Sequence, residues 1–178
     1  MTANAANPES AVTPSAAPLP AAQRTRWAWM VATGFGLGYL RPPGTWASAV
    51  TVLVWWFAAR ALPAAWVLPV AVAAALVIAF LGMAAATVVA RESGREDPQV
   101  IVVDEVAGQL TALIAVGPSW QSFLASFILF RCFDILKPPP VRRLERIASG
   151  AGIVLDDLMA GLYARLALAA LSYFGVLT

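Results

Sequence analysis

The chain has 178 residues, of which 60% are hydrophobic and only 12% are charged. Soluble domains carry about a quarter charged residues, so this composition excludes an ordinary soluble domain and predicts a single-domain integral membrane protein. The net charge of +2 gives no reason to expect nucleic-acid binding, and one cysteine cannot form an internal disulfide.

Residues 1–22 are rich in Ala, Pro, Ser and Thr and predict a disordered tail, because they offer too little apolar surface to bury. We expect the folded domain to occupy residues 23–178. It opens with a basic and aromatic stretch, and a segment rich in glycine and proline follows over 34–44, where a regular helix is excluded. Thr45 then predicts the N-cap of a helix over 46–60.

Further apolar segments predict helices over 63–90, 105–116, 119–137 and 153–177. Ser119 is suited to cap the third of these, and the prolines at 138–140 end it. The Gly-Ala-Gly segment at 150–152 predicts a flexible link before the last helix. The helices over 46–60 and 105–116 are short for a full crossing, which needs about 20 residues.

Basic residues recur at alternate ends of these helices. The positive-inside rule then places one set of ends in the cytoplasm, with Arg60 as an exception. We therefore expect an all-α, polytopic membrane helical bundle with short or half-inserted helices and a cytoplasm-facing site. The topology gathers the following residues at one face: Arg41, Asp104, Glu105, Asp134, Lys137, Asp156 and Asp157.

These acidic residues interrupt or border apolar runs. A charged group at the centre of a membrane helix costs roughly 2.5–3.5 kcal/mol on insertion scales, so such residues usually serve a function. Carboxylates without histidine or thiolate partners favour a hard cation, most plausibly Mg²⁺.

The segment 103–108 (VDEVAG) is echoed by 155–161 (LDDLMAG). Each has two acids followed about a turn later by Ala-Gly, and small residues allow helices to approach closely. The echo predicts two acid-tipped helices, packed side by side and sharing one cation. The alternative is that the acids only stabilise helix N-termini.

Two further groups suggest an anion site. Arg131, Asp134 and Lys137 are spaced by three and share a helical face, which is typical either of a phosphate site beside Mg²⁺ or of a salt-bridged helix end. Arg41, Gly44 and Thr45 surround a predicted helix N-terminus, where backbone N–H groups can bind an anion. The alternative for this loop is a purely structural role.

Taken together, these segments resemble the phosphatidylglycerophosphatase A family. The resemblance runs from about Trp29 to Tyr163 and is carried by 34–46, by 102–108, by 130–138 (FRCFDILKP) and by 152–161. It implies an all-helical, Mg²⁺-dependent inner-membrane enzyme that removes the terminal phosphate of phosphatidylglycerophosphate. Position by position, it implies catalytic and metal-binding roles for Asp104, Glu105, Asp134, Asp156 and Asp157. The implied phosphate contacts are Arg41, Gly44, Thr45, Arg131 and Lys137.

Attack by water on the phosphate is our preferred mechanism, and attack by an aspartate stays an alternative. From other classes, a small membrane transporter and a non-catalytic lipid-phosphate-binding protein are the rivals. We expect a multi-pass protein of the bacterial inner membrane whose site faces the cytoplasm. The sequence gives no oligomeric state and no protein partner.

Overall fold

A computed structural model of the chain describes residues 20, 23–139, 141–144 and 149–177. Over these residues it is all-helical, with no strand. The elements are α1 (Arg26–Ala32), the 3-10 helix η2 (Leu37–Tyr39), α2 (Pro43–Ala61), α3 (Ala64–Ser93), α4 (Val103–Ala112), α5 (Trp120–Leu136), α6 (Val141–Leu144) and α7 (Gly150–Tyr173). Apart from Pro20, the tail predicted over 1–22 lies outside the described residues.

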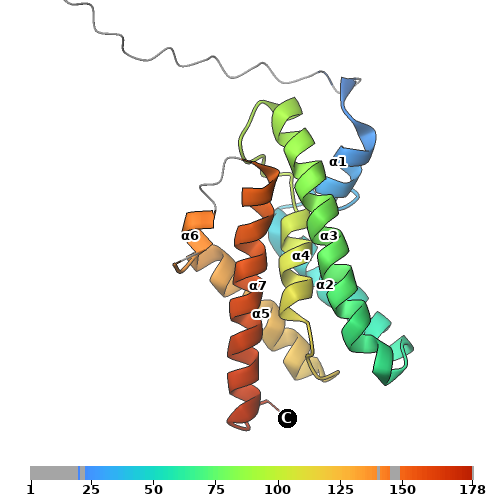
Figure 1. Cartoon of the computed structure of the whole chain (residues 1–178), viewed down its shortest axis with the longest axis vertical. Coiled ribbons are helices and arrows are strands. Elements are labelled where there is room, and N and C mark those ends of the chain that lie inside the picture. The colour runs from blue at the N-terminus through green and yellow to red at the C-terminus, as the bar shows by residue number, and fades with distance from the viewer. Residues whose placement is uncertain (1–19, 21–22, 140, 145–148, 178) are drawn as a thin grey trace, which may run out of the picture.

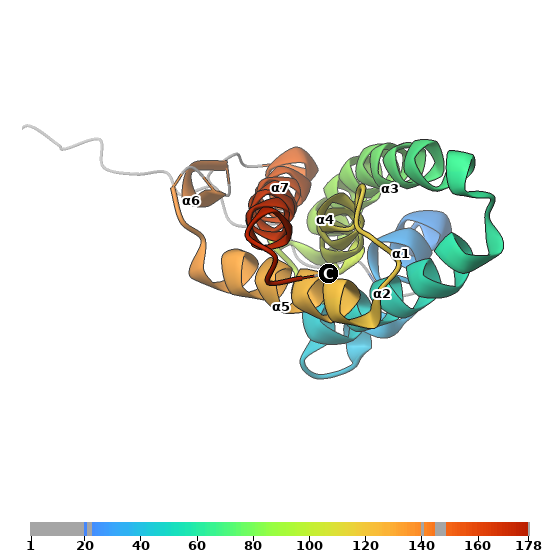
Figure 2. The same cartoon turned by 90° about the horizontal axis from the view of Figure 1, so that it is seen from below.

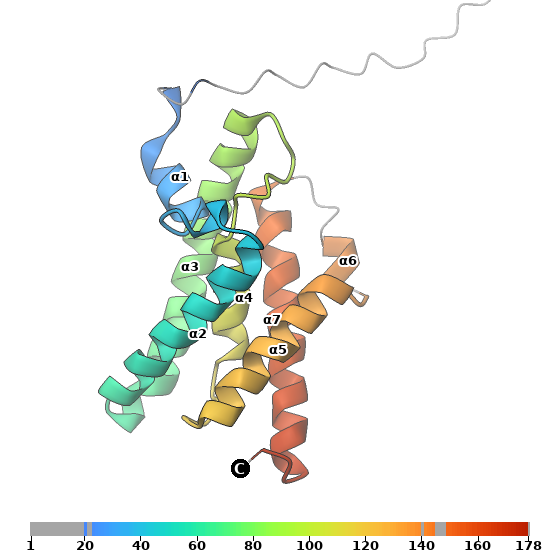
Figure 3. The same cartoon turned by 180° about the vertical axis from the view of Figure 1, so that it is seen from behind.

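The helices form two layers (Figure 1, Figure 2). Helices α3, α4 and α7 make one layer, while α2 and α5 lie across it with a common tilt (Figure 3). Helices α2, α3, α4, α5 and α7 alternate in direction along the chain, as the predicted topology requires. As a result α2, α4 and α7 begin at the same end of the bundle, where α3 and α5 finish.

Helix α1 is tied to the end of α3 by one carboxylate. Glu92 accepts hydrogen bonds from the backbone N–H of Thr25 (3.0 Å), from its hydroxyl (2.5 Å) and from Trp29 Nε1 (2.7 Å). The Arg24 guanidinium lies 4.0 Å from the centre of the Trp29 ring. These contacts hold the start of the described domain against α3.

Helix α2 begins three residues earlier than predicted. Pro43 occupies its first turn and Pro42 is the N-cap residue, so Thr45 lies inside the helix and the predicted Thr45 cap is wrong. Proline is favoured at this position because its fixed φ suits the helix and the first turn needs no N–H donor. No α-helix forms over 34–42, where Gly34 and Gly36 have φ values of 54° and 102°, but the exclusion predicted over 34–44 is wrong at Pro43 and Gly44, which belong to α2.

Helix α5 follows its predicted signals. The Ser119 hydroxyl accepts from the backbone N–H of Ser122 at 3.2 Å, so the predicted cap is confirmed. The helix ends at Lys137, whose φ of 44° is left-handed, just before Pro138. In the apolar interior, Gln109 of α4 donates to the hydroxyl of Ser126 at 3.1 Å.

The predicted flexible link at 150–152 is instead the first turn of α7. Gly150 and Gly152 are buried, and a Cβ at Gly150 would collide with the backbone of Met83 and Thr87 on α3. The missing side chains therefore permit helix packing here, which offsets the low helix propensity of glycine.

Among the described helices, α3 is long and apolar enough to cross a bilayer, with 30 residues and only 22% of its most apolar stretch buried in the protein. Exposed apolar side chains, among them Trp66, Leu76 and Phe80, cover its outer surface. A soluble protein would leave this large surface in water, so the helix indicates a membrane protein. At only 10 residues, α4 is about 15 Å long and cannot cross on its own.

Candidate functional site

A polar cavity of about 600 Å³ opens where α2, α4 and α7 begin and α5 ends. Eight of the ten predicted site residues line it: Gly44, Asp104, Glu105, Arg131, Asp134, Lys137, Asp156 and Asp157. The described residues that line it carry seven carboxylates but only two basic groups. The cavity therefore has a strong excess of negative charge, which an anionic substrate could enter only together with cations.

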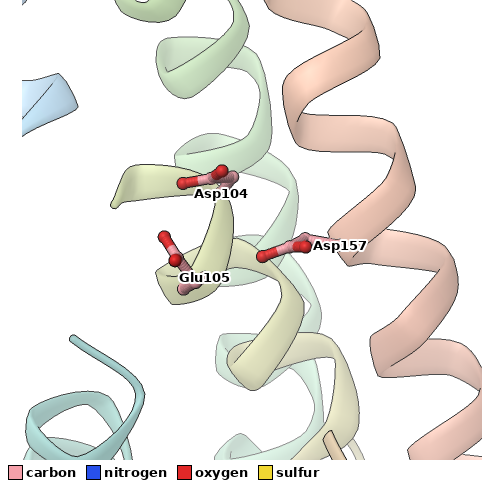
Figure 4. A group of neighbouring side chains, drawn as sticks. All are labelled: Asp104, Glu105 and Asp157. Carbon is pink, nitrogen blue, oxygen red and sulfur yellow. The ribbon is translucent and has the colours of Figure 1, made fainter. Parts of the chain in front are cut away.

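Three of the carboxylates form a compact cluster (Figure 4). Asp104 and Glu105 come from the first turn of α4, and Asp157 points toward them from α7. One oxygen from each lies within 4.8 Å of the other two. Such a group can bind a metal ion, because each carboxylate offers a negatively charged oxygen to a common point.

The cluster is only partly compensated, by Arg131 Nη1 at 4.0 Å from Glu105 Oε1. The buried oxygens Asp104 Oδ1, Glu105 Oε2 and Asp157 Oδ2 have no hydrogen-bond donor among the described residues. Burial raises the pKa of Asp104 well above its ordinary value, and the neighbouring Glu105 carboxylate raises it further. Burial is also the main cause of the raised pKa of Glu105. A buried, unpaired carboxylate is costly, so these three side chains are suited to a cation.

The other two predicted acids are paired with bases. Asp134 Oδ2 lies 2.6 Å from Arg131 Nη1, one turn away on α5. Asp156 Oδ2 accepts from Lys137 Nζ at 2.9 Å and so links α7 to the end of α5. The predicted set of five acids therefore divides into three that are clustered and two that hold Arg131 and Lys137 at the cavity.

Gly44 is placed against the acidic cluster. A Cβ at this position would collide with the Glu105 carboxylate and come within 2.8 Å of Arg131 Nη1. The other two predicted loop residues, Arg41 and Thr45, are not among the residues that line the cavity. Thr45 is not at the start of α2, where it was predicted, because the helix already begins at Pro43 and Thr45 lies inside it.

The sequence reasoning missed four polar residues of the cavity, which are Glu96, Asp97, Gln99 and Ser149. The first three belong to the segment between α3 and α4, for which the sequence analysis predicted no role. Their position shortly before the acids of α4 was the available signal, since a short connection keeps its residues close to the helix that follows. Ser149 directly precedes α7 and had no comparable signal.

Comparison with known proteins identifies the family of the chain. The family model described as phosphatidylglycerophosphatase A matches residues 30–172. The chain is 36% identical over 148 residues to the phosphatidylglycerophosphatase A of Haemophilus influenzae, which covers 82% of this chain and 88% of the relative. It is 34% identical over 139 residues to the phosphatidylglycerophosphatase A of Escherichia coli, with 74% and 76% covered.

A third relative comes from Bacteroides thetaiotaomicron and is provisionally named as a phosphatidylinositol-3-phosphatase. It is 36% identical over 138 residues, covering 75% of this chain and 86% of the relative. No solved structure matches the chain. The family match spans the cavity and the helices that build it, and the chain belongs to the phosphatidylglycerophosphatase A family.

Proposed function

We propose that this protein is a lipid phosphatase that hydrolyses the terminal phosphomonoester of phosphatidylglycerophosphate, giving phosphatidylglycerol and phosphate. Family membership and the names of two relatives support the reaction. The observation that carries the proposal is the buried three-carboxylate cluster beside Arg131 and Lys137 in one cavity. That combination suits a phosphate that arrives with a divalent cation.

We propose that the cation is Mg²⁺ and that Asp104, Glu105 and Asp157 hold it. The fit rests on the donor set, because Mg²⁺ prefers oxygen ligands and each of the three carboxylates has a buried oxygen without a hydrogen-bond donor among the described residues. When bound, Mg²⁺ supplies positive charge that offsets the phosphoryl oxygens and promotes attack by water. The proposed metal set is thus narrower than the five acids that the family resemblance implies.

Arg131 and Lys137 would bind the phosphate. Their partners Asp134 and Asp156 fix the two cationic groups at the cavity, so that little reorganisation is needed when the anion arrives. In the proposed step, a water oxygen bonds to phosphorus while the bond from phosphorus to the ester oxygen breaks. A cavity carboxylate accepts the proton that water loses and then gives a proton to the leaving glycerol oxygen. Asp134 lies outside the cluster and is our candidate for orienting that water.

We also propose a multi-pass arrangement in the bacterial inner membrane, with residues 23–178 as the membrane domain and the cavity facing the cytoplasm. Most basic residues precede or follow the helix ends that surround the cavity, among them Arg41, Arg91 and Lys137. At the opposite end, Arg60 and Arg165 are exceptions. This bias supports a cytoplasmic cavity, at the depth where a lipid headgroup would meet it.

The decisive experiment measures phosphate release by the purified protein in detergent or vesicles. Phosphatidylglycerophosphate is the main substrate, and phosphatidylinositol 3-phosphate is included because one relative bears that name. We expect release from the first lipid with Mg²⁺ and none after chelation. Release from the inositol lipid alone would reassign the substrate. Binding without release would favour a non-catalytic protein, and neither binding nor release would favour the transporter.

A further inference from the structure

An apolar groove of about 490 Å³ runs between α2 and α5 on the outer surface of the bundle. It is lined from α2 by Ala49, Leu53 and Trp56 and from α5 by Trp120, Leu124 and Phe127, among others. None of the described side chains that line it is charged. Leu53, Leu124 and Trp120 leave 56%, 48% and 62% of their surface exposed, so the groove is open along its side.

The groove continues from the polar cavity along the same two helices. Gly44 of α2 lines the cavity, and Ala49 enters the groove five residues later, about 7–8 Å farther along the helix axis. On α5, Phe127 precedes the cavity residue Arg131 by one turn. On both helices the groove residues therefore follow the cavity residues within about two turns, so the path along α2 and α5 changes from polar to apolar.

The length and direction of this path match one leaflet of a bilayer. From Gly44 to Trp56, α2 advances about 18 Å, and half of the hydrocarbon thickness is about 15 Å. Because the path leads from the headgroup-binding end toward the opposite end of the bundle, a lipid with its phosphate in the cavity would direct its tails along the groove.

The other side of α5 is less open to a lipid. The rings of Phe133 on α5 and Tyr163 on α7 lie 5.7 Å apart, centre to centre. The Tyr163 hydroxyl also donates to the carbonyl oxygen of Pro139 at 3.0 Å. These contacts join α5 to α7 beside Lys137, which leaves the α2–α5 side as the lateral route from the bilayer.

We propose that the α2–α5 groove binds one acyl chain of the lipid substrate while the phosphate occupies the cavity. The inference rests on the proposed function and adds a binding site for the tail. The groove contributes binding free energy only for substrates with long chains, because van der Waals packing against the acyl chain is the interaction that it offers within a bilayer. Chain recognition is thus separate from phosphate recognition.

The test compares two substrates with the same terminal phosphomonoester: diacyl phosphatidylglycerophosphate and its deacylated, water-soluble counterpart. The variant Ala49→Trp fills the end of the groove that is nearest to the cavity. Ala73→Trp places the same bulk on an exposed face of α3 and serves as the matched control. We expect Ala49→Trp to lower the ratio of kcat/KM for the diacyl substrate to that for the deacylated one by about tenfold or more. The control should keep the wild-type ratio.

An unchanged ratio in Ala49→Trp would overturn the groove assignment, whether both activities fall together or neither falls. If the wild-type protein releases phosphate from neither substrate, the proposed function itself fails, and this outcome is distinct. If only the diacyl substrate is cleaved, photo-crosslinking replaces the ratio. A diazirine-bearing acyl chain should label α2 and α5, and unlabelled substrate should compete with it. Labelling spread evenly over all lipid-facing helices would refute the proposal.

Discussion

Gly108 and Gly161 lie against each other where α4 packs on α7. A Cβ built on Gly161 would collide with the carbonyl oxygen of Gly108, and one on Gly108 would come within 2.6 Å of the carbonyl oxygen of Asp157. Each glycine follows an acid of the cluster by four residues, about one helical turn. The close contact therefore sets the distance between Asp104 and Asp157. It confirms the predicted packing of the two acid-tipped helices, while the shared cation stays a proposal.

Replacing Gly161 by alanine should separate these helices. We expect Gly161→Ala to cost about 1–3 kcal/mol in the free energy of unfolding, the usual range for overpacking, and to weaken Mg²⁺ binding because the carboxylates move apart. Thermal unfolding with and without Mg²⁺ measures both effects. Gly117→Ala is the control, since a Cβ there meets nothing within 4 Å. Equal melting temperatures for the two variants would contradict this account of the contact.

Replacing Asp157 by asparagine should separate metal binding from folding. The wild-type cluster holds uncompensated buried oxygens, so removing one charge should raise Tm in metal-free buffer by a few degrees, because repulsion falls. The same variant should lose the increase in Tm that Mg²⁺ gives the wild type, together with phosphate release. A variant that keeps the full Mg²⁺-dependent increase would remove Asp157 from the proposed metal set.

Replacing Lys137, which pairs with Asp156, should reduce catalysis without affecting metal binding. Lys137→Met should lower kcat/KM for phosphate release by roughly 10²-fold, the scale seen when one preorganised charge is removed. It should leave Mg²⁺-dependent stabilisation in place, because Lys137 is outside the carboxylate cluster. Lys137→Arg keeps the charge and should recover part of the activity. If Lys137→Met releases phosphate at the wild-type rate, the side chain is only a helix-end contact.

The Glu92 contacts should stabilise the attachment of α1. Glu92→Gln removes the charge from an acceptor of three hydrogen bonds, and we expect a loss of about 1–2 kcal/mol with faster proteolysis near Thr25. Glu96→Gln is the control for stability, since Glu96 is an exposed acid of the following loop. Matched proteolysis rates in the two variants would show that α1 is held mainly by its apolar contacts.

The elements that sequence could predict are those specified by local chemistry. Apolar length predicted α3, Ser119 marked the start of α5, and Pro138 marked its end. The gathering of the acids could be predicted from the alternating directions of the helices, because alternation places the starts of α2, α4 and α7 at the same end of the bundle. Boundaries failed where tertiary packing decides them, as at Gly150, whose contact with α3 was invisible in the sequence. The division of the acids into clustered and paired groups also depends on side-chain geometry that spacing alone does not contain.

The contact between Gly108 and Gly161 has a consequence for ion selectivity. Carboxylates on flexible loops can adjust to ions of several radii. Asp104 and Asp157 instead belong to two helices whose backbones are in direct contact at Gly108 and Gly161. The spacing between α4 and α7 therefore fixes the distance between the backbones that carry the two carboxylates. A larger ion such as Ca²⁺ would have to be accommodated by rotation of the carboxylate side chains, so we expect the packing of the bundle to limit which ions bind.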